Sequence, residues 1–134
     1  MDTSYAIITI IAALLSGAIA TIITICVNKK YETRKNKLDL VNQIIGYRYQ
    51  LYTPLHQGRA EIYSALCRIP IVFNDNSAVM FAFNEFIVNV RNAGTTEEMA
   101  RSERKKEALI RSLCEAVNLK YEKWETDNFK NLIR

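Results

Sequence analysis

The sequence has 134 residues, of which 18 are basic and 14 acidic, and its net charge is +4. A single histidine excludes a histidine-rich metal site, three cysteines without a CxxC spacing exclude a disulfide framework, and four scattered glycines exclude a Gly-rich phosphate loop. We therefore expect no metal, no cofactor and no enzymatic activity. All 18 basic residues but only 13 acidic ones follow position 27, so this part carries a net charge of +5.

The first predicted element is a transmembrane helix over residues 5–27. This run of 23 residues has no charged side chain. At about 1.5 Å per residue it reaches roughly 34 Å, enough to cross a hydrocarbon core of about 30 Å. A cleaved signal peptide is the competing interpretation, because Ala18-Ile19-Ala20 resembles a cleavage site. Residues 1–4 have no basic side chain and the apolar run continues to Val27, which favours an uncleaved anchor.

Basic residues that directly follow this helix predict its orientation. They are Lys29, Lys30, Arg34, Lys35 and Lys37. By the positive-inside rule, residues 1–4 are expected outside the membrane and residues 28–134 are expected to form a cytoplasmic domain. The same five cations are expected among the lipid head groups of the bilayer. Cys26, at the membrane exit, is interpreted as a lipid-facing thiol, with S-acylation as the alternative.

One side of the transmembrane helix is predicted to gather its small and hydroxyl-bearing residues. They are Thr9, Ala13, Ser16, Gly17, Ala20, Thr21 and Thr24. At about 100° per residue these positions share one half of the helix, opposite most of the isoleucines and leucines. Small residues at four-residue spacing let helix backbones approach closely, so the pattern predicts a homo-oligomer. Two alternatives are that small residues are common in membrane helices anyway and that the hydroxyls line a water-filled lumen.

The rest of the sequence predicts an all-α fold in which the transmembrane helix continues into a cytosolic bundle of about four helices. These helices are expected over residues 30–51, 59–69, 78–92 and 95–118. Pro54 and Pro70 are expected to end the first two, because proline and the residue before it disfavour helical continuation. Residues 74–77 offer caps for the third helix, and residues 95–98 match a capping box for the fourth. Residues 121–134 are expected to form a short last helix.

Helical spacing of apolar residues predicts the core of the bundle. The expected positions are Val41, Ile44, Ile45, Leu51, Tyr52, Ile62, Leu66, Ile69, Val79, Phe83, Phe86, Ile87, Val90, Leu109, Ile110, Leu113 and Val117. Cys67 and Cys114 are expected to be small buried residues. Charges on the fourth helix are balanced, which indicates a solvated face and no direct nucleic-acid binding.

Polar residues inside the bundle are predicted to be structural. Arg48 is expected to pair with Glu61 or Glu85. Glu85 is likewise expected in an ion pair rather than as a catalytic acid. The alternative is a divergent helical ribonuclease in which Arg48 and His56 meet.

Several stretches resemble an uncharacterised bacterial family, classed as a domain of unknown function. They are Gln43–Arg48, Ala65-Leu66, Ile71–Phe73, Val79, Ala82-Phe83 and Glu85–Ile87. The resemblance covers residues 30–90 and implies one N-terminal membrane helix with a cytosolic helical domain. The family opens its second helix with a Ser-Pro-Glu-His-like stretch, whereas residues 59–62 read Arg-Ala-Glu-Ile and share only Glu61. This departure argues against a histidine-based role.

Function follows from the resemblance only by analogy. In plan, the chain is similar to auxiliary membrane proteins of type VI CRISPR systems, which assemble into membrane rings. The first expectation is therefore a self-assembling accessory or effector of anti-phage defence that perturbs or permeabilises the membrane. The main alternative is a membrane-tethered adaptor or scaffold for a cytosolic protein partner.

Overall fold

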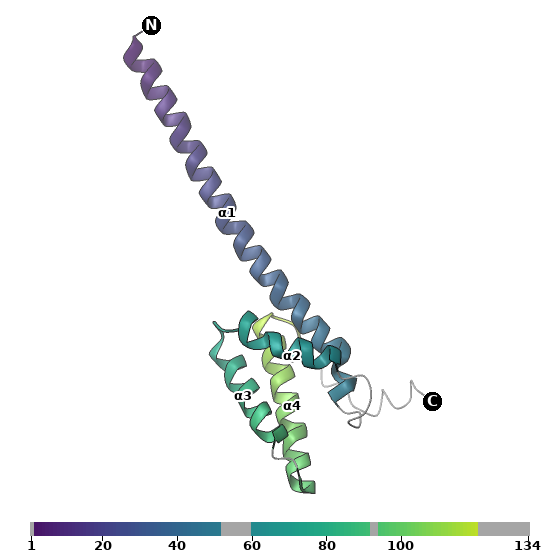
Figure 1. The fold of residues 1–134 in the computed structure, drawn as a ribbon. Coiled ribbons are helices and arrows are strands. Elements are labelled where there is room, and N and C mark those ends of the chain that lie inside the picture. Colours follow the sequence, from purple (N-terminus) through teal and green to yellow (C-terminus); the bar gives the residue numbers. More distant parts are fainter. Residues whose placement is uncertain (1, 52–59, 92–93, 121–134) are drawn as a thin grey trace. The chain divides into compact units, whose positions relative to one another are not determined.

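The computed structural model describes residues 2–51, 60–91 and 94–120. Within these ranges the chain forms four α-helices and one 3-10 helix and contains no strand, which confirms the predicted all-α class (Figure 1). The chain divides into two units, residues 1–36 and residues 37–134. The expected last helix at residues 121–134 lies outside the described residues, as do Tyr52 and His56.

Helix α1 spans Thr3–Tyr47, and its part up to Asn36 belongs to the first unit. It is long and apolar enough to cross a membrane, by length and composition. Every residue from Asp2 to Asn36 is exposed, and the side chain of Leu14 remains 69% exposed. Apolar area in water costs about 25 cal/mol per Å², and a bilayer removes this cost along the whole segment. These features support the predicted single membrane-spanning helix.

The C-terminal end of α1 tightens into a 3-10 helix, η1, over Arg48–Leu51. The helical course was predicted to run towards Leu51, and in the described residues it does so with a change of helix type over the last four positions. The Lys106 ammonium donates to the Leu51 carbonyl oxygen at 3.2 Å. This bond satisfies one of the carbonyls that a helix end leaves without an intrahelical partner.

Helix α2 spans Ala60–Val72 and contains Pro70, so the prediction that proline stops this helix at residue 69 is wrong. Proline lacks one N–H and crowds the preceding turn, but in the last turn of a helix few bonds depend on it. The Phe73 N–H still donates to the Ile69 carbonyl at 2.9 Å. Ile69 and Phe73 are both fully buried, and their packing carries the helix past the proline.

The buried Gln50 side chain fixes the start of α2 from η1. Its Oε1 accepts from the Ile62 N–H at 3.2 Å, and its Nε2 donates to Glu61 Oε2 at 3.2 Å. The amide oxygen thus satisfies one of the N–H groups that the first turn of a helix leaves open. This cap comes from another element, which a local sequence pattern does not reveal.

Helix α3 spans Ser77–Arg91 and begins at the predicted capping turn. Asn76 Oδ1 accepts from the Val79 N–H at 3.1 Å, as an N-cap asparagine does. Helix α4 spans Thr96–Ala116, and its predicted capping box is present. The Glu98 N–H donates to Thr95 Oγ1 at 3.2 Å, and the Thr95 N–H donates to Glu98 Oε2 at 2.9 Å. Figure 1 shows α3 and α4 side by side.

Helix α4 ends two residues before the expected Asn118, because Asn118 adopts a left-handed conformation with φ of 58°. The Leu119 N–H donates to the Cys114 carbonyl at 2.8 Å, and the Asn118 N–H donates to the Glu115 carbonyl at 3.1 Å. This pair of bonds is a Schellman motif, in which asparagine tolerates the positive φ better than most residues.

The core of the second unit is formed by apolar residues of all four α-helices and of the turn after α2. They are Leu40, Val41, Ile44, Ile62, Ala65, Leu66, Ile69, Phe73, Val79, Phe86, Leu109, Ile110, Leu113, Cys114 and Val117. Most of the expected core positions are among them, and Ile45, Leu51 and Phe83 pack against them partly buried. The amphipathic periodicity therefore located the core on three of the helices almost completely.

Three expected core residues are exposed instead. Ile87 and Val90 of α3 are 37% and 41% exposed, and Cys67 of α2 is exposed. The apolar stripe of α3 is wider than the arc that its neighbours cover. Cys114 is buried as expected, and burial raises the pKa of its thiol. Phe73, which the sequence placed only in a connection, is fully buried.

Lys37 ties the part of α1 that belongs to the second unit to the turn before α3. Its Nζ donates to both carboxylate oxygens of Asp75, at 2.7 and 2.8 Å, and lies 5.5 Å from the centroid of the Phe73 ring. The hydrogen bond from Lys37 is the main cause that holds the pKa of Asp75 below its usual value. Accepted N–H bonds from Gly94 and Thr95 likewise lower the pKa of Glu98.

Acid is expected to weaken the domain through these two carboxylates. A pKa that is lower in the folded state than in the unfolded chain stabilises the fold above the unfolded value, and this contribution is lost as pH falls through the folded pKa. We expect the unfolding midpoint of the full chain to fall as pH drops below about 4. The Asp75→Asn variant should be less stable than the wild type at pH 7, and the gap should close in acid. A gap of equal size at both pH values would show that Asp75 does not contribute by this route.

Candidate functional site

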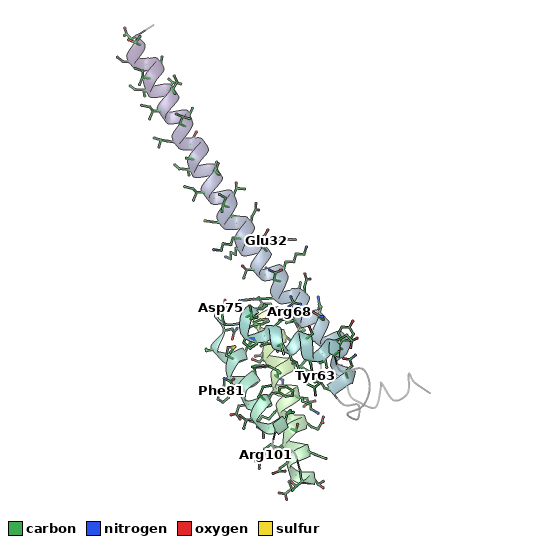
Figure 2. All side chains as sticks on the ribbon, in the orientation of Figure 1. Glu32, Tyr63, Arg68, Asp75, Phe81 and Arg101 are labelled. Atoms are coloured by element: carbon green, nitrogen blue, oxygen red, sulfur yellow. The ribbon has the colours of Figure 1, made fainter. Side chains whose placement is uncertain are left out.

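The small-residue face of α1 consists of the seven predicted positions on one side of the membrane segment. They are Thr9, Ala13, Ser16, Gly17, Ala20, Thr21 and Thr24. The structure places all of them on one unbroken stretch of α1, and all are exposed. Side chains project from the helix along its whole length (Figure 2). Because the helix is continuous here, the azimuths expected from about 100° per residue apply, and the seven positions share one half of its surface.

The hydroxyl groups of this face donate their hydrogen bonds within the helix. Thr9 Oγ1 donates to the Tyr5 carbonyl, Thr21 Oγ1 to that of Gly17 and Thr24 Oγ1 to that of Ala20, each at 2.8 Å. Ser16 Oγ donates to the Ala13 carbonyl at 2.9 Å.

These bonds change the chemistry that the sequence alone suggested. A hydroxyl that donates to a backbone carbonyl of its own helix leaves no unsatisfied donor in hydrocarbon. The hydroxyls therefore do not require a partner helix, although each oxygen keeps lone pairs that can accept a bond. This face would therefore favour helix association mainly by letting two helix backbones pack closely, rather than by hydrogen bonds between helices.

Gly17 is the position where a partner backbone can come closest. A Cβ added there would meet no atom within 4 Å beyond its chain neighbours and the backbone of its own helical turns. Nothing inside the chain therefore requires glycine at this position, and a helix interior disfavours it by about 1 kcal/mol relative to alanine. The absence of a side chain is most useful for a contact with another helix.

The five predicted head-group cations divide into two sets. Lys29, Lys30, Arg34 and Lys35 belong to the first unit and are exposed. Lys37 belongs to the second unit, where Asp75 neutralises its charge and its side chain is only 17% exposed. The first four remain candidates for lipid phosphates, and the structure gives Lys37 a partner within the domain.

The polar residues expected to be structural hold elements of the domain together. Glu85 on α3 pairs with Lys105 on α4 at 2.9 Å, and a pairing of Arg48 with Glu61 or Glu85 stays a prediction. Glu61 accepts a hydrogen bond from Gln50. In the described ranges, no group of three or more His, Cys, Asp and Glu residues is placed to hold a metal ion.

Comparison with known proteins adds the family. The model of the Family of unknown function (DUF6680) matches residues 1–130. The chain belongs to this family. The match includes the long apolar helix of the first unit as well as most of the helical domain. No curated protein and no solved structure matches the chain.

One surface of this DUF6680 chain was missed in the sequence. Phe81 and Val88 of α3 are 68% and 55% exposed. These two residues are seven positions apart, on the side of α3 opposite Val79 and Phe86. The helical periodicity identified the buried stripe of α3 and left these two residues unassigned. A second apolar stripe on one helix was the signal that could have shown this surface.

Proposed function

We propose that this DUF6680 chain is a self-assembling single-pass membrane protein whose copies contact one another through the small-residue face of α1. The observation that carries the proposal is the combination of a fully exposed, uncharged helical segment, residues 5–27, with seven small or hydroxyl-bearing residues on one side. Lipid chains cover large aliphatic side chains well, whereas small residues gain more from a second helix that packs into them.

The proposed orientation places residues 1–4 outside a bacterial inner membrane and the helical domain in the cytoplasm. Lys29, Lys30, Arg34 and Lys35 support it, because basic residues next to a membrane helix stay on the cytoplasmic side. All four are exposed and can reach anionic head groups, at about 1 kcal/mol each near the surface.

The proposed role is that of a non-enzymatic accessory or effector of anti-phage defence, whose oligomer perturbs or permeabilises the membrane. The likeness in plan to auxiliary proteins of type VI CRISPR systems supports the defence context, and it is an analogy of architecture. Permeation through a hydroxyl-lined lumen has the weakest support, since the hydroxyl groups of the small-residue face already donate their hydrogen bonds within α1.

Subunit counting tests the proposal. The full chain is extracted from native membranes into polymer nanodiscs, and the mass of single particles is measured by mass photometry. We expect particles that contain several copies of the chain. The dilution is chosen so that a control single-pass protein, extracted in the same way, gives particles with one copy. A single copy per particle would overturn the proposal and leave a tethered adaptor as the better explanation of the same fold.

A further inference from the structure

The outer face of α3 is an unpartnered surface on the cytosolic domain. It consists of Ser77, Ala78, Phe81, Asn84 and Val88. At about 100° per residue these positions fall within one third of the helix circumference, opposite the buried Val79 and Phe86. All five are exposed, and in the part of the chain that the structure describes no element covers them. Figure 2 labels Phe81 on this helix.

We propose that the outer face of α3 binds the same face of a second copy of the chain. This inference rests on the proposed self-assembly and names the contact that the cytosolic domains make within it. The reasons are the charge of the face, its symmetry and the membrane tether.

The charge of the face selects among possible partners. From Ser77 to Val90 the only charged residue is Glu85, which lies on the same third of the helix between Phe81 and Ala78, and Lys105 neutralises it at 2.9 Å. Helix α4, in contrast, has five acidic and five basic residues. An acidic protein or an anionic lipid surface would bind where cations gather, and this stretch has none. A second copy has the same net charge of +5 after position 27, so two copies meet with least repulsion on a neutral face.

The spacing of the face suits a two-fold contact. Phe81 and Val88 lie three and four residues on either side of Asn84. A two-fold axis near Asn84 therefore brings Phe81 of each copy against Val88 of the other and sets two asparagine amides side by side. Such isologous interfaces use one patch twice, and a large side chain opposite a smaller one packs without a clash.

The membrane tether makes a small face sufficient. Two exposed apolar side chains per copy are few for a contact between free proteins in solution. Copies that already associate through α1 hold their domains at a high effective concentration, so a weak second contact forms readily. The face is then expected to set how the domains are arranged in the assembly rather than to create the assembly.

Site-specific oxidation tests the contact in the full chain. Cys26 and Cys67 are replaced by serine, Asn84→Cys is added, and native membranes are treated with copper phenanthroline. We expect a disulfide-linked dimer from this variant and little from a matched Ala108→Cys variant, whose position on α4 is also exposed. Adding Phe81→Glu should lower the dimer yield at Asn84→Cys about tenfold, because it places a charge against the apolar Val88 of the other copy.

The outcomes separate this inference from the function on which it rests. Equal dimer yields at the two positions, or a yield that Phe81→Glu leaves unchanged, would overturn the α3 contact. If particles from the same membranes still contain several copies, the proposed self-assembly stands without it. If the introduced thiol at position 84 is shielded from a water-soluble maleimide and forms no dimer, the face lies against lipid or another protein, and the inference is wrong.

Discussion

Replacing Ser16 and Gly17 with leucine is expected to leave the chain in the membrane and to separate its copies. Leucine favours both helix formation and insertion, and a Cβ at Gly17 meets nothing within 4 Å in the chain itself. The two larger side chains keep a second backbone at a distance from the small-residue face. We expect the apparent association constant in native membranes to fall at least about tenfold, which corresponds to about 1.4 kcal/mol.

The matched control for this variant is Ala18→Leu. Ala18 is the neighbour of Gly17, is equally exposed, and lies on the opposite side of α1 among the larger aliphatic side chains. It therefore receives the same kind of substitution without entering the proposed contact. Fluorescence energy transfer between labelled copies measures both variants at equal expression. If Ala18→Leu weakens association as much as the Ser16 and Gly17 changes do, the small-residue face is not the contact.

Replacing Phe73 with alanine is expected to be the most destabilising single change in the helical domain. Its ring is fully buried and lies under the Lys37 ammonium, which is 5.5 Å from the ring centroid. Deletion of a buried phenylalanine costs about 3–5 kcal/mol, and domains of this size have about 5–15 kcal/mol in total. In a domain of this size each kcal/mol of lost stability lowers the unfolding midpoint by about 4–8 °C, so the midpoint should fall by more than about 12 °C.

Phe81→Ala is the control that makes this loss interpretable. It removes the same side chain from a position that is 68% exposed, so the expected change in stability is within about 0.5 kcal/mol. Helical circular dichroism of the full chain in dilute micelles follows the unfolding of the domain, while the micelle-embedded part of α1 contributes a constant signal. Equal midpoints for the two variants would place Phe73 outside the core.

The interior of each helix was largely predictable because its signals are local. The Thr95–Glu98 capping box begins α4 as expected, since both of its hydrogen bonds join residues three positions apart. The turn before α3 was predictable for the same reason. Residues such as Leu109 and Leu113 recur with the period of the helix, so their burial could be anticipated without knowing what covers them.

Prediction failed where neighbours distant in the chain decide the outcome. Pro70 is tolerated because Ile69 and Phe73 are anchored by other helices. Gln50 caps a helix that begins ten residues later, and no short-range pattern indicates such a bond.

For the candidate site, the sequence by itself determined the membrane segment and its two unlike sides. Hydropathy and the distribution of small residues are properties of one continuous helix, and they need no tertiary contact to be expressed. Only the coordinates of that helix showed that its hydroxyl donors are already satisfied by carbonyls of the preceding turn.

Tertiary structure alone decided the roles of Lys37 and of α3. In the sequence Lys37 is one of five similar cations, and it becomes an ion-pair partner only because folding brings Asp75, 38 residues away, within 2.7 Å. The apolar residues of α3 exceed what its neighbours can cover, and which of them stay exposed depends on how α4 packs. Periodicity determines that a helix has an apolar side, whereas the contacts of the folded domain determine which apolar residues stay exposed.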